Sequence, residues 1–329
     1  MLRLLALFVL FVGLLDFSRK EVLSMKYLNI GGVIPAPEIA LGCMRLSGLS
    51  RPDAEKLIRT ALDLGVHFFD HADIYGGGAC ETIFAEAAGM TPSLREQMLI
   101  QTKCGIRPGQ YDFSREHILA SVDASLKRLR TDYVDFLLLH RPDTLMEPEE
   151  VAEAFRLLKR EGKVRFFGVS NQNAGQMTLL SKYCVETPLL VNQLQFSMTE
   201  CGIIDAGLNV NMTNSAGVNR DGGILEFCRL NEITIQPWSP FQYGFFEGVF
   251  LGSDKFPQLN QKVNELAEKY SAAPEAIAIA WILRHPARMQ PIVGTTSARR
   301  LTDICKASEI TLTRQEWYEL YLSAGKKLP

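Results

Sequence analysis

The sequence predicts an α/β protein with the fold of a (β/α)8 TIM barrel, and three observations favour that fold. Eight short apolar runs that read as β-strands alternate with helical segments between residues 39 and 306. Runs such as residues 136–139 are apolar on both faces, which is typical of parallel strands covered by helices. The glycines at residues 76–78 lack the Gly-x-Gly-x-x-Gly spacing of a dinucleotide-binding turn, which disfavours an open Rossmann-type sheet.

The predicted elements follow one another in a regular order. The first helix shows the local signals, because Ser50 suits the N-cap, Pro52 the first turn and Gly65 the end. Strands are predicted at residues 39–44, 67–72, 98–104, 134–140, 164–170, 189–195, 233–239 and 290–294. Helices are predicted at residues 51–64, 80–88, from 114, 148–161, 174–183, 223–230, 257–270, 274–284 and 298–306.

Two further segments lie outside this alternation. Residues 25–38 precede the first barrel strand, and we expect them to form a β-hairpin that caps the floor of the barrel. Residues 199–221 are rich in Asn, Gly, Ser and Thr, and loops of this length are usually functional or mobile. We therefore expect this loop to overhang the active end of the barrel.

Composition and charge narrow the class of protein. Of the 329 residues, 47% are hydrophobic and 22% are charged, which is the balance of a globular enzyme with a large core. The net charge of −2 gives no reason to expect a nucleic acid or an anionic membrane as partner. The seven cysteines are odd in number and contain no Cys-x-x-Cys pair, so we expect reduced thiols and a cytoplasmic location.

The N-terminus allows three interpretations. Residues 4–15 are apolar apart from Gly13, and this run is shorter than the roughly 20 residues that span a bilayer. It suits the apolar part of a signal peptide or anchor, or a short helix, or sequence upstream of a true start at Met25. We treat residues 1–24 as a leader and residues 25–329 as one domain, with membrane contact expected only if the leader is real.

Four residues form the predicted catalytic site. Asp70, Lys103 and His140 each end a predicted strand, and Tyr75 lies in the loop that follows Asp70. Active sites of such barrels lie at the C-terminal ends of the strands, and neighbouring strands are roughly 5 Å apart. The three strand-end side chains should therefore meet, in a proton-donating site that needs no metal.

Physical chemistry suggests a role for each of these groups. A buried Lys103 would lose its proton unless Asp70 lay beside it. The ammonium should then lower the pKa of Tyr75 from about 10 and make the phenol a general acid, while His140 donates a hydrogen bond to a substrate oxygen. The alternatives are an ordinary buried ion pair with a core histidine, and a Schiff-base aldolase that uses Lys103 as nucleophile.

Seven short segments carry a resemblance to a known family. They are residues 69–76 (FDHADIYG), 102–103 (TK), 135–142 (DFLLLHRP), 168–171 (GVSN), 192–193 (NQ), 238–240 (WSP) and 293–295 (VGT). With these segments the chain resembles the aldo-keto reductase superfamily over about residues 27–310, and the resemblance is closest to bacterial reductases with a Leu-His-Arg-Pro-Asp motif at the fourth strand.

This resemblance implies a nicotinamide cofactor bound in an extended form across the barrel mouth, without a Rossmann fold. Asp70, Tyr75, Lys103 and His140 match the catalytic tetrad of the family. Positions that match cofactor-binding residues are Ser170, Asn171 and Gln193 for the carboxamide, Trp238 for stacking on the nicotinamide, Ser239, Gly294 and Thr295, and Arg300 for the 2′-phosphate.

The match is weaker after the eighth strand. Gly294 replaces a frequent Lys or Arg, and Ile304 stands where an Asn commonly contacts adenine. Arg300 can form a forked contact with a phosphate, so NADPH is favoured, with NADH as the alternative. Arg299 and Arg300 could instead be a solvated helix start.

We therefore expect an NADPH-dependent reductase of a small-molecule aldehyde or ketone, acting as a monomer or weak homo-oligomer. The rival interpretation is a non-catalytic, redox-sensing regulatory subunit that binds NADP(H) on the same fold. The substrate pocket should be lined by residues 43–46, 104–113, 199–222 and 241–256. An apolar or aromatic substrate is suggested by Phe241, Tyr243, Phe245 and Phe246.

Overall fold

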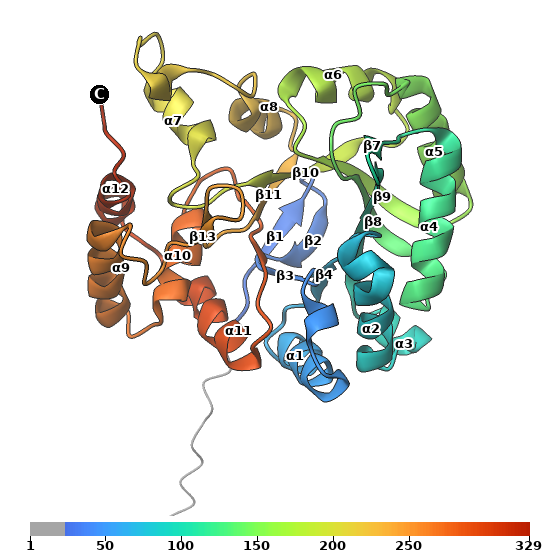
Figure 1. Ribbon diagram of the computed structural model, residues 1–329, viewed down its shortest axis with the longest axis horizontal. Coiled ribbons are helices and arrows are strands. Elements are labelled where there is room, and N and C mark those ends of the chain that lie inside the picture. Colours follow the sequence, from blue (N-terminus) through green and yellow to red (C-terminus); the bar gives the residue numbers. More distant parts are fainter. Residues whose placement is uncertain (1–23) are drawn as a thin grey trace, which may run out of the picture.

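Eight parallel strands surrounded by helices form the centre of the computed structural model, which describes residues 24–329 (Figure 1). The strands pair in the order β11-β10-β9-β8-β5-β4-β3-β14. A hydrogen bond from the Gln290 amide to the Ile235 carbonyl (3.0 Å) joins the two ends of this sheet, and the predicted (β/α)8 barrel is confirmed. The barrel strands are β3 (Ala40–Gly42), β4 (Phe68–Asp70), β5 (Leu99–Cys104), β8 (Val134–Leu139), β9 (Val164–Ser170), β10 (Leu189–Gln195), β11 (Thr234–Trp238) and β14 (Ile292–Val293).

The helices lie close to their predicted positions. The Ser50 hydroxyl accepts a hydrogen bond from the Asp53 amide (3.3 Å), as expected for the N-cap of α1. No helix was predicted where α3, α7 and α12 lie, although Thr313 and Glu316 form a capping box that marks the start of α12. The helices are α1 (Arg51–Asp63), α2 (Ala79–Ala88), α3 (Pro92–Arg95), α4 (Arg115–Leu129), α5 (Pro148–Arg160), α6 (Ala174–Tyr183), α7 (Gly202–Leu208), α8 (Ile224–Leu230), α9 (Pro257–Lys269), α10 (Pro274–Leu283), α11 (Ala298–Cys305) and α12 (Arg314–Ser323).

Three hairpins complete the fold. The first, β1 (Tyr27–Ile30) with β2 (Ile34–Pro37), is the hairpin predicted at the N-terminal end of the domain. The other two lie in loops that follow barrel strands. They are β6 (Ile106–Arg107) with β7 (Gln110–Tyr111), and β12 (Gln242–Tyr243) with β13 (Gly248–Val249).

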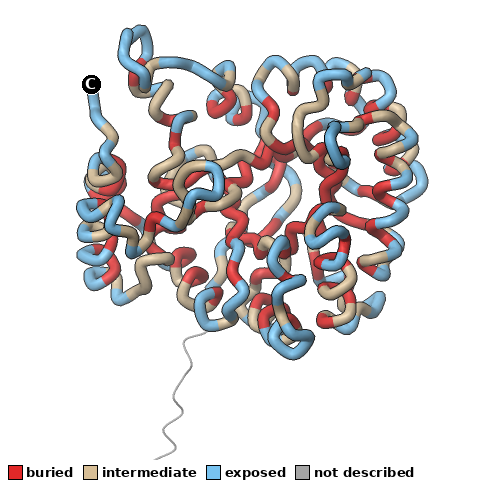
Figure 2. The backbone as a smooth tube through the Cα atoms, viewed as in Figure 1, coloured by how far each residue is buried: buried red, intermediate tan, exposed pale blue. Residues whose placement is uncertain are grey.

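The first hairpin closes the floor of the barrel. Ile30 and Ala36 are fully buried and belong to the same apolar cluster as Phe136 and Leu138 in the barrel interior. The Gly31 amide also donates to the Thr234 hydroxyl of β11 (3.0 Å). The larger apolar core lies between the strands and the helices, so the strands are buried on both faces (Figure 2).

The loop at residues 199–221 does not overhang the barrel mouth, and that expectation was wrong. Its α7 carries Asp205, which accepts hydrogen bonds from the Tyr321 hydroxyl (2.8 Å) and the Lys326 ammonium (2.7 Å) of the C-terminal segment. Cys201 and Ile204 are buried in the outer core. These contacts hold the loop on the outside of the barrel, beside α8 and near the C-terminus (Figure 1).

The cysteines and the helices give two further findings. All seven cysteines are buried and free of disulfide bonds. Within residues 24–329, no helix is both long and apolar enough to cross a membrane. The predicted leader, residues 1–24, lies outside the described residues except for Ser24.

If the hairpin closes the floor, Ile30→Ala should lower the free energy of unfolding by about 2–5 kcal/mol, because it leaves a cavity in the barrel interior. Urea denaturation measures this loss. Val33 lies in the turn of the same hairpin and is 66% exposed, so Val33→Ala should change stability by less than about 0.5 kcal/mol. Equal losses in both variants would contradict the packing described for this hairpin.

Candidate active site

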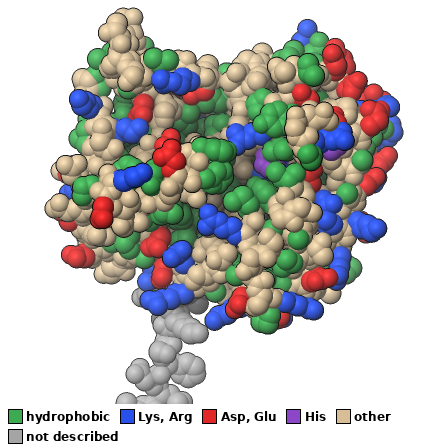
Figure 3. Space-filling model, in the orientation of Figure 1, with side chains coloured by type: hydrophobic (Ala, Val, Ile, Leu, Met, Phe, Trp, Pro, Cys, Tyr) green, Lys and Arg blue, Asp and Glu red, His purple; other side chains and the backbone are tan. Residues whose placement is uncertain are grey.

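A cavity of about 910 Å³ opens at the C-terminal ends of the barrel strands. Histidine, basic and apolar side chains lie near the middle of the face shown in Figure 3. Lys103 is fully buried and is not part of the cavity wall. The predicted site residues that line the cavity are Asp70, Tyr75, His140, Ser170, Asn171, Gln193, Trp238, Ser239, Gly294, Thr295 and Arg300.

Strand register brings the tetrad together. Asp70 is the last residue of β4 and pairs with Gln101 of β5, two residues before Lys103. Lys103 pairs with Leu138 of β8, and the His140 amide donates to the Cys104 carbonyl (2.9 Å) just after that strand. Three adjacent strands therefore deliver the three side chains to the same end of the barrel.

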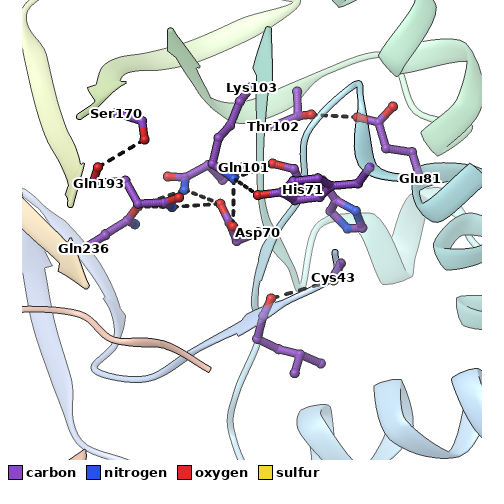
Figure 4. A network of polar contacts seen from close by, with 12 residues as sticks. Cys43, Asp70, His71, Glu81, Gln101, Thr102, Lys103, Ser170, Gln193 and Gln236 are labelled. Atoms are coloured by element: carbon purple, nitrogen blue, oxygen red, sulfur yellow. Dashed lines mark hydrogen bonds and ion pairs between the residues drawn. The ribbon is translucent and has the colours of Figure 1, made fainter. Parts of the chain in front are cut away.

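Lys103 is the centre of the site. Its ammonium donates to the Asp70 carboxylate (Oδ2, 2.8 Å) and the His71 carbonyl (2.7 Å) (Figure 4). It also donates to the Tyr75 hydroxyl (3.2 Å). Burial by itself lowers the pKa of Lys103, but the charge and hydrogen bond of Asp70, together with Tyr75, outweigh it and leave the pKa raised. The structure therefore holds this lysine in its charged form.

Tyr75 is placed by a glycine turn. Gly76 and Gly77 have positive φ angles (59° and 63°), and a Cβ at Gly76 would lie 2.9 Å from the Ser47 hydroxyl. Burial raises the pKa of Tyr75, while the charge of Lys103 opposes this rise without overcoming it. The expectation that the pKa would fall below 10 is corrected, because the phenol has been moved away from water.

His140 faces Tyr75 across the cavity. The two ring centres are 5.9 Å apart, and the rings meet edge to face at 82°. Burial lowers the pKa of His140 well below its ordinary value, and the charges of Lys103 and Arg141 act in the same direction. The imidazole is thus neutral, and its Nδ1 has no hydrogen-bond partner among the residues that the structure describes. It can donate one N–H to a bound oxygen.

The ends of β9, β10 and β11 present a chain of polar groups. The Ser170 hydroxyl donates to the backbone carbonyl of Gln193 (3.1 Å) and accepts from the side-chain Nδ2 of Asn171 (2.7 Å). The Trp238 indole N–H donates to the side-chain oxygen Oδ1 of Asn171 (3.0 Å). Asn171 and Ser239 both have positive φ angles (58° and 52°), a strained conformation that is often found at binding sites.

An aromatic cluster covers one side of the cavity. Phe246 stacks on Trp238 (5.9 Å between ring centres, 25°), and Phe245 meets the same ring edge to face. The Arg141 guanidinium lies 5.6 Å from the centre of the Trp238 ring. A ligand ring that stacks on Trp238 must share the indole with these neighbours. Tyr243, expected in this wall, instead packs on Phe256 (5.1 Å).

The predicted phosphate contact, Arg300, also lies on the cavity wall. The Arg300 side chain lies at the start of α11, and its Nε is 3.5 Å from the Glu275 carboxylate. Glu275 also lines the cavity, so a negative charge lies beside the arginine there. Ile304 is fully buried in the outer core and is not part of the cavity wall.

Several residues of the site were not predicted. Arg141 and Glu275 line the cavity, although neither was named as a site residue, whereas Arg45 lies in the segment 43–46 that was expected to line the pocket. Gln101 and Gln236 are fully buried beneath Asp70. Gln101 stands two residues before Lys103, and Gln236 two residues before Trp238, so each shares a strand face with a predicted site residue. A polar residue on the inward face of an apolar strand was the signal in the sequence that could have identified them.

Two side chains next to the tetrad residues, His71 and Cys104, lie outside the site. Within residues 24–329 no group of three or more His, Cys, Asp or Glu side chains could hold a metal ion. His71 turns its ring away from the site onto Phe84, with 4.5 Å between ring centres. Cys104 lies in the outer core, because strand alternation turns the residue after Lys103 away from the barrel interior.

Known proteins are similar to this chain in sequence. A model of the aldo/keto reductase family matches residues 38–321. The uncharacterized oxidoreductase YcsN of Bacillus subtilis (strain 168) is 38% identical over 320 residues, which cover 93% of this chain and 100% of the relative. A 6-dehydroglucose reductase of Agrobacterium fabrum is 34% identical over 319 residues, 92% of this chain and 100% of the relative.

A solved structure shows the same arrangement. The thermostable aldo-keto reductase Tm1743, determined with the inhibitor epalrestat, matches with a TM-score of 0.73 at 27% identity, and the match covers 91% of this chain and 100% of that one. The family match covers most of the described barrel, and both relatives are oxidoreductases by name. This chain therefore belongs to the aldo/keto reductase family, and it is an oxidoreductase of the kind that acts on small-molecule carbonyl compounds.

Proposed function

We propose that this protein reduces an aldehyde or ketone to an alcohol with NADPH, and that Tyr75 is the general acid. The observation that carries the proposal is the position of the Lys103 ammonium, 2.8 Å from Asp70 and 3.2 Å from the Tyr75 hydroxyl. Tyr75 and His140 both face the cavity. A phenol with a fixed cation behind it and a neutral imidazole beside it is suited to protonating a carbonyl oxygen.

Each side chain has a separate task in this reaction. The nicotinamide, when bound, supplies the hydride that reduces the carbonyl carbon. His140 donates a hydrogen bond to the carbonyl oxygen and orients it. Tyr75 gives its proton to that oxygen as negative charge develops there, and Lys103 stabilises the phenolate that remains. The phenolate then recovers a proton from solvent, so the overall reaction consumes one hydride and one proton.

The cavity offers groups that fit the cofactor. One Asn171 N–H and the Gln193 Oε1 have no partner within residues 24–329, so they could donate to and accept from a carboxamide. Trp238 offers an aromatic face, and Arg300 a cation for a 2′-phosphate. Ser239, Gly294 and Thr295 also line the cavity.

The substrate class and location are also part of the proposal. Trp238, Phe245 and Phe246 on the cavity wall support an apolar or aromatic carbonyl compound. The seven free cysteines support a reducing compartment such as the cytoplasm.

Removing the acid should abolish most turnover. Tyr75→Phe should lower kcat by about 10²–10⁴ and leave the Kd for NADPH near the wild-type value, because the ring stays and only the proton is lost. Steady-state kinetics over a panel of carbonyl compounds and fluorescence titration with NADPH measure the two effects.

Tyr133 is a matched control, because its ring packs between Arg95 and Arg165 and is not part of the cavity wall. Tyr133→Phe should keep wild-type kcat. Full turnover by Tyr75→Phe would remove it as the acid. Tight NADPH binding without turnover by the wild-type protein would favour the redox-sensing subunit instead.

Arg300 and Glu275 should have opposite effects on cofactor choice. Arg300→Ala should weaken NADPH by about 10- to 100-fold with little change for NADH, because one charge-assisted phosphate contact is lost. Glu275→Gln should strengthen NADPH, since it removes a carboxylate that competes for the arginine. Binding titrations with both cofactors measure these changes, and equal weakening of NADPH and NADH by Arg300→Ala would show that the phosphate is bound elsewhere.

A further inference from the structure

Four glutamine side chains fill the barrel interior directly beneath Asp70. Gln101, Gln236 and Gln290 are fully buried, and Gln193 is nearly so. They come from four different strand regions, and three of them are drawn with Asp70 in Figure 4. A layer of amides at this depth replaces the apolar side chains that fill most of such a barrel.

The amides form a continuous hydrogen-bonded chain. The Gln290 Nε2 donates to the Pro37 carbonyl at the barrel floor (2.7 Å), and the Gln236 Nε2 donates to the Gln290 Oε1 (2.8 Å). The Gln236 Oε1 accepts from the Nε2 atoms of Gln101 (2.8 Å) and Gln193 (3.2 Å). We call this set of four glutamines the amide relay.

The direction of the amide relay is fixed from the floor. A backbone carbonyl can only accept, so Gln290 must turn its NH₂ group toward Pro37 and its oxygen toward Gln236. Gln236 must then present its oxygen to the next pair of amides. Gln101 and Gln193 in turn must present their NH₂ groups, because an oxygen there would face the oxygen of Gln236.

Both NH₂ groups also reach Asp70. Its Oδ1 accepts from the Gln101 Nε2 (2.6 Å) and the Gln193 Nε2 (3.1 Å), while its Oδ2 accepts from Lys103 (2.8 Å). These three donors approach both carboxylate oxygens. The side chain is therefore held in one orientation.

One orphaned atom supports a constraint on Gln101. Its Oε1 is buried and has no hydrogen-bond partner within residues 24–329. Flipping the amide would remove both the bond to Asp70 and the bond to Gln236. The unpaired oxygen is accepted because the NH₂ group is needed on the other side.

From these contacts we infer that Gln101 and Gln236 are positioning residues for the reaction: the amide relay carries a fixed hydrogen-bond direction from the floor hairpin to Asp70, and so holds this carboxylate in one orientation against Lys103 and takes up part of its negative charge. This inference rests on the proposed function for its kinetic consequence. The electrostatic consequence, a firmly charged Lys103 beside Tyr75, can be measured without turnover.

Gln101→Met tests the inference, because Met keeps the unbranched shape and removes the donor. Asp70 loses its shortest hydrogen bond, so more of its negative charge acts on Lys103 and Tyr75. Less of the ammonium charge is then left to stabilise the Tyr75 phenolate. We expect the pKa of Tyr75 to rise by about 1, and kcat for carbonyl reduction to fall about tenfold at unchanged Kd for NADPH.

The pKa is measured on the full chain labelled with ¹³Cζ-tyrosine, where the signal missing in Tyr75→Phe identifies the residue. Alcohol oxidation, the reverse reaction, needs the Tyr75 phenolate, so its rate should rise with pH. In Gln101→Met this rise should occur at a pH about one unit higher than in the wild-type protein. If the wild-type protein reduces no carbonyl compound, the proposed function fails, but the NMR titration still decides on the amide relay.

Asn192 supplies a matched control. It is a fully buried amide of β10 that donates to the Gln172 carbonyl (2.8 Å) and does not contact Asp70. Asn192→Leu should lower the Tm and leave the pKa of Tyr75 unchanged.

If Gln101→Met does not fold, Gln236→Met tests the same relay one hydrogen bond further from Asp70, and the pKa of Tyr75 should rise by a smaller amount. If Gln101→Met, or Gln236→Met in its place, folds and the pKa of Tyr75 is unchanged, the inference is overturned, whatever the Tm of the variant.

Discussion

Lys103 is a fully buried cation, and the rest of the site depends on its ion pair with Asp70. Removing an ammonium group from water carries a penalty of several kcal/mol, and a buried lysine without a partner would give up its proton. Here the ammonium reaches the carboxylate at 2.8 Å and a backbone carbonyl at 2.7 Å. Because β4 and β5 are paired in register, these contacts are a property of the barrel itself and need no mobile loop.

Burial has opposite consequences for the two groups that flank this cation. It raises the pKa of Tyr75, so the phenol keeps its proton at neutral pH, as an acid must. It lowers the pKa of His140, so the imidazole stays neutral and can act as a donor without adding charge. Lys103 opposes the first shift and reinforces the second. The cation matters most when the proton leaves Tyr75, because it then faces a phenolate at hydrogen-bond distance.

Much of the barrel and the tetrad followed from local sequence signals. Asp70, Lys103 and His140 could be placed because each ends an apolar strand, and the order of strands in a barrel makes those ends neighbours. The motifs that carry the family resemblance predicted that Tyr75 and the expected cofactor-binding residues lie at the barrel mouth, and these residues line the cavity. The hairpin at the floor was predictable because it comes just before the first strand.

Other features depend on contacts between distant segments. Loop composition does not show that Asp205 will bind Tyr321 and Lys326, so the loop at residues 199–221 was placed wrongly. The sign of the Tyr75 shift depends on how much water the whole barrel excludes. The glutamines lie on separate strands and become one network only when the barrel closes, so a single Gln in an apolar run gave no reason to connect it with Asp70.

The most direct test of the account is the protonation state of Lys103 itself. ¹⁵Nζ-lysine NMR on the full chain, with Lys103→Met to assign the signal, can follow this ammonium as the pH is raised. We predict that it stays protonated until the pH exceeds the ordinary lysine value of about 10.4, because Asp70 and Tyr75 raise its pKa. Loss of the proton between about pH 6 and 9, as for a buried lysine without a partner, would contradict the account.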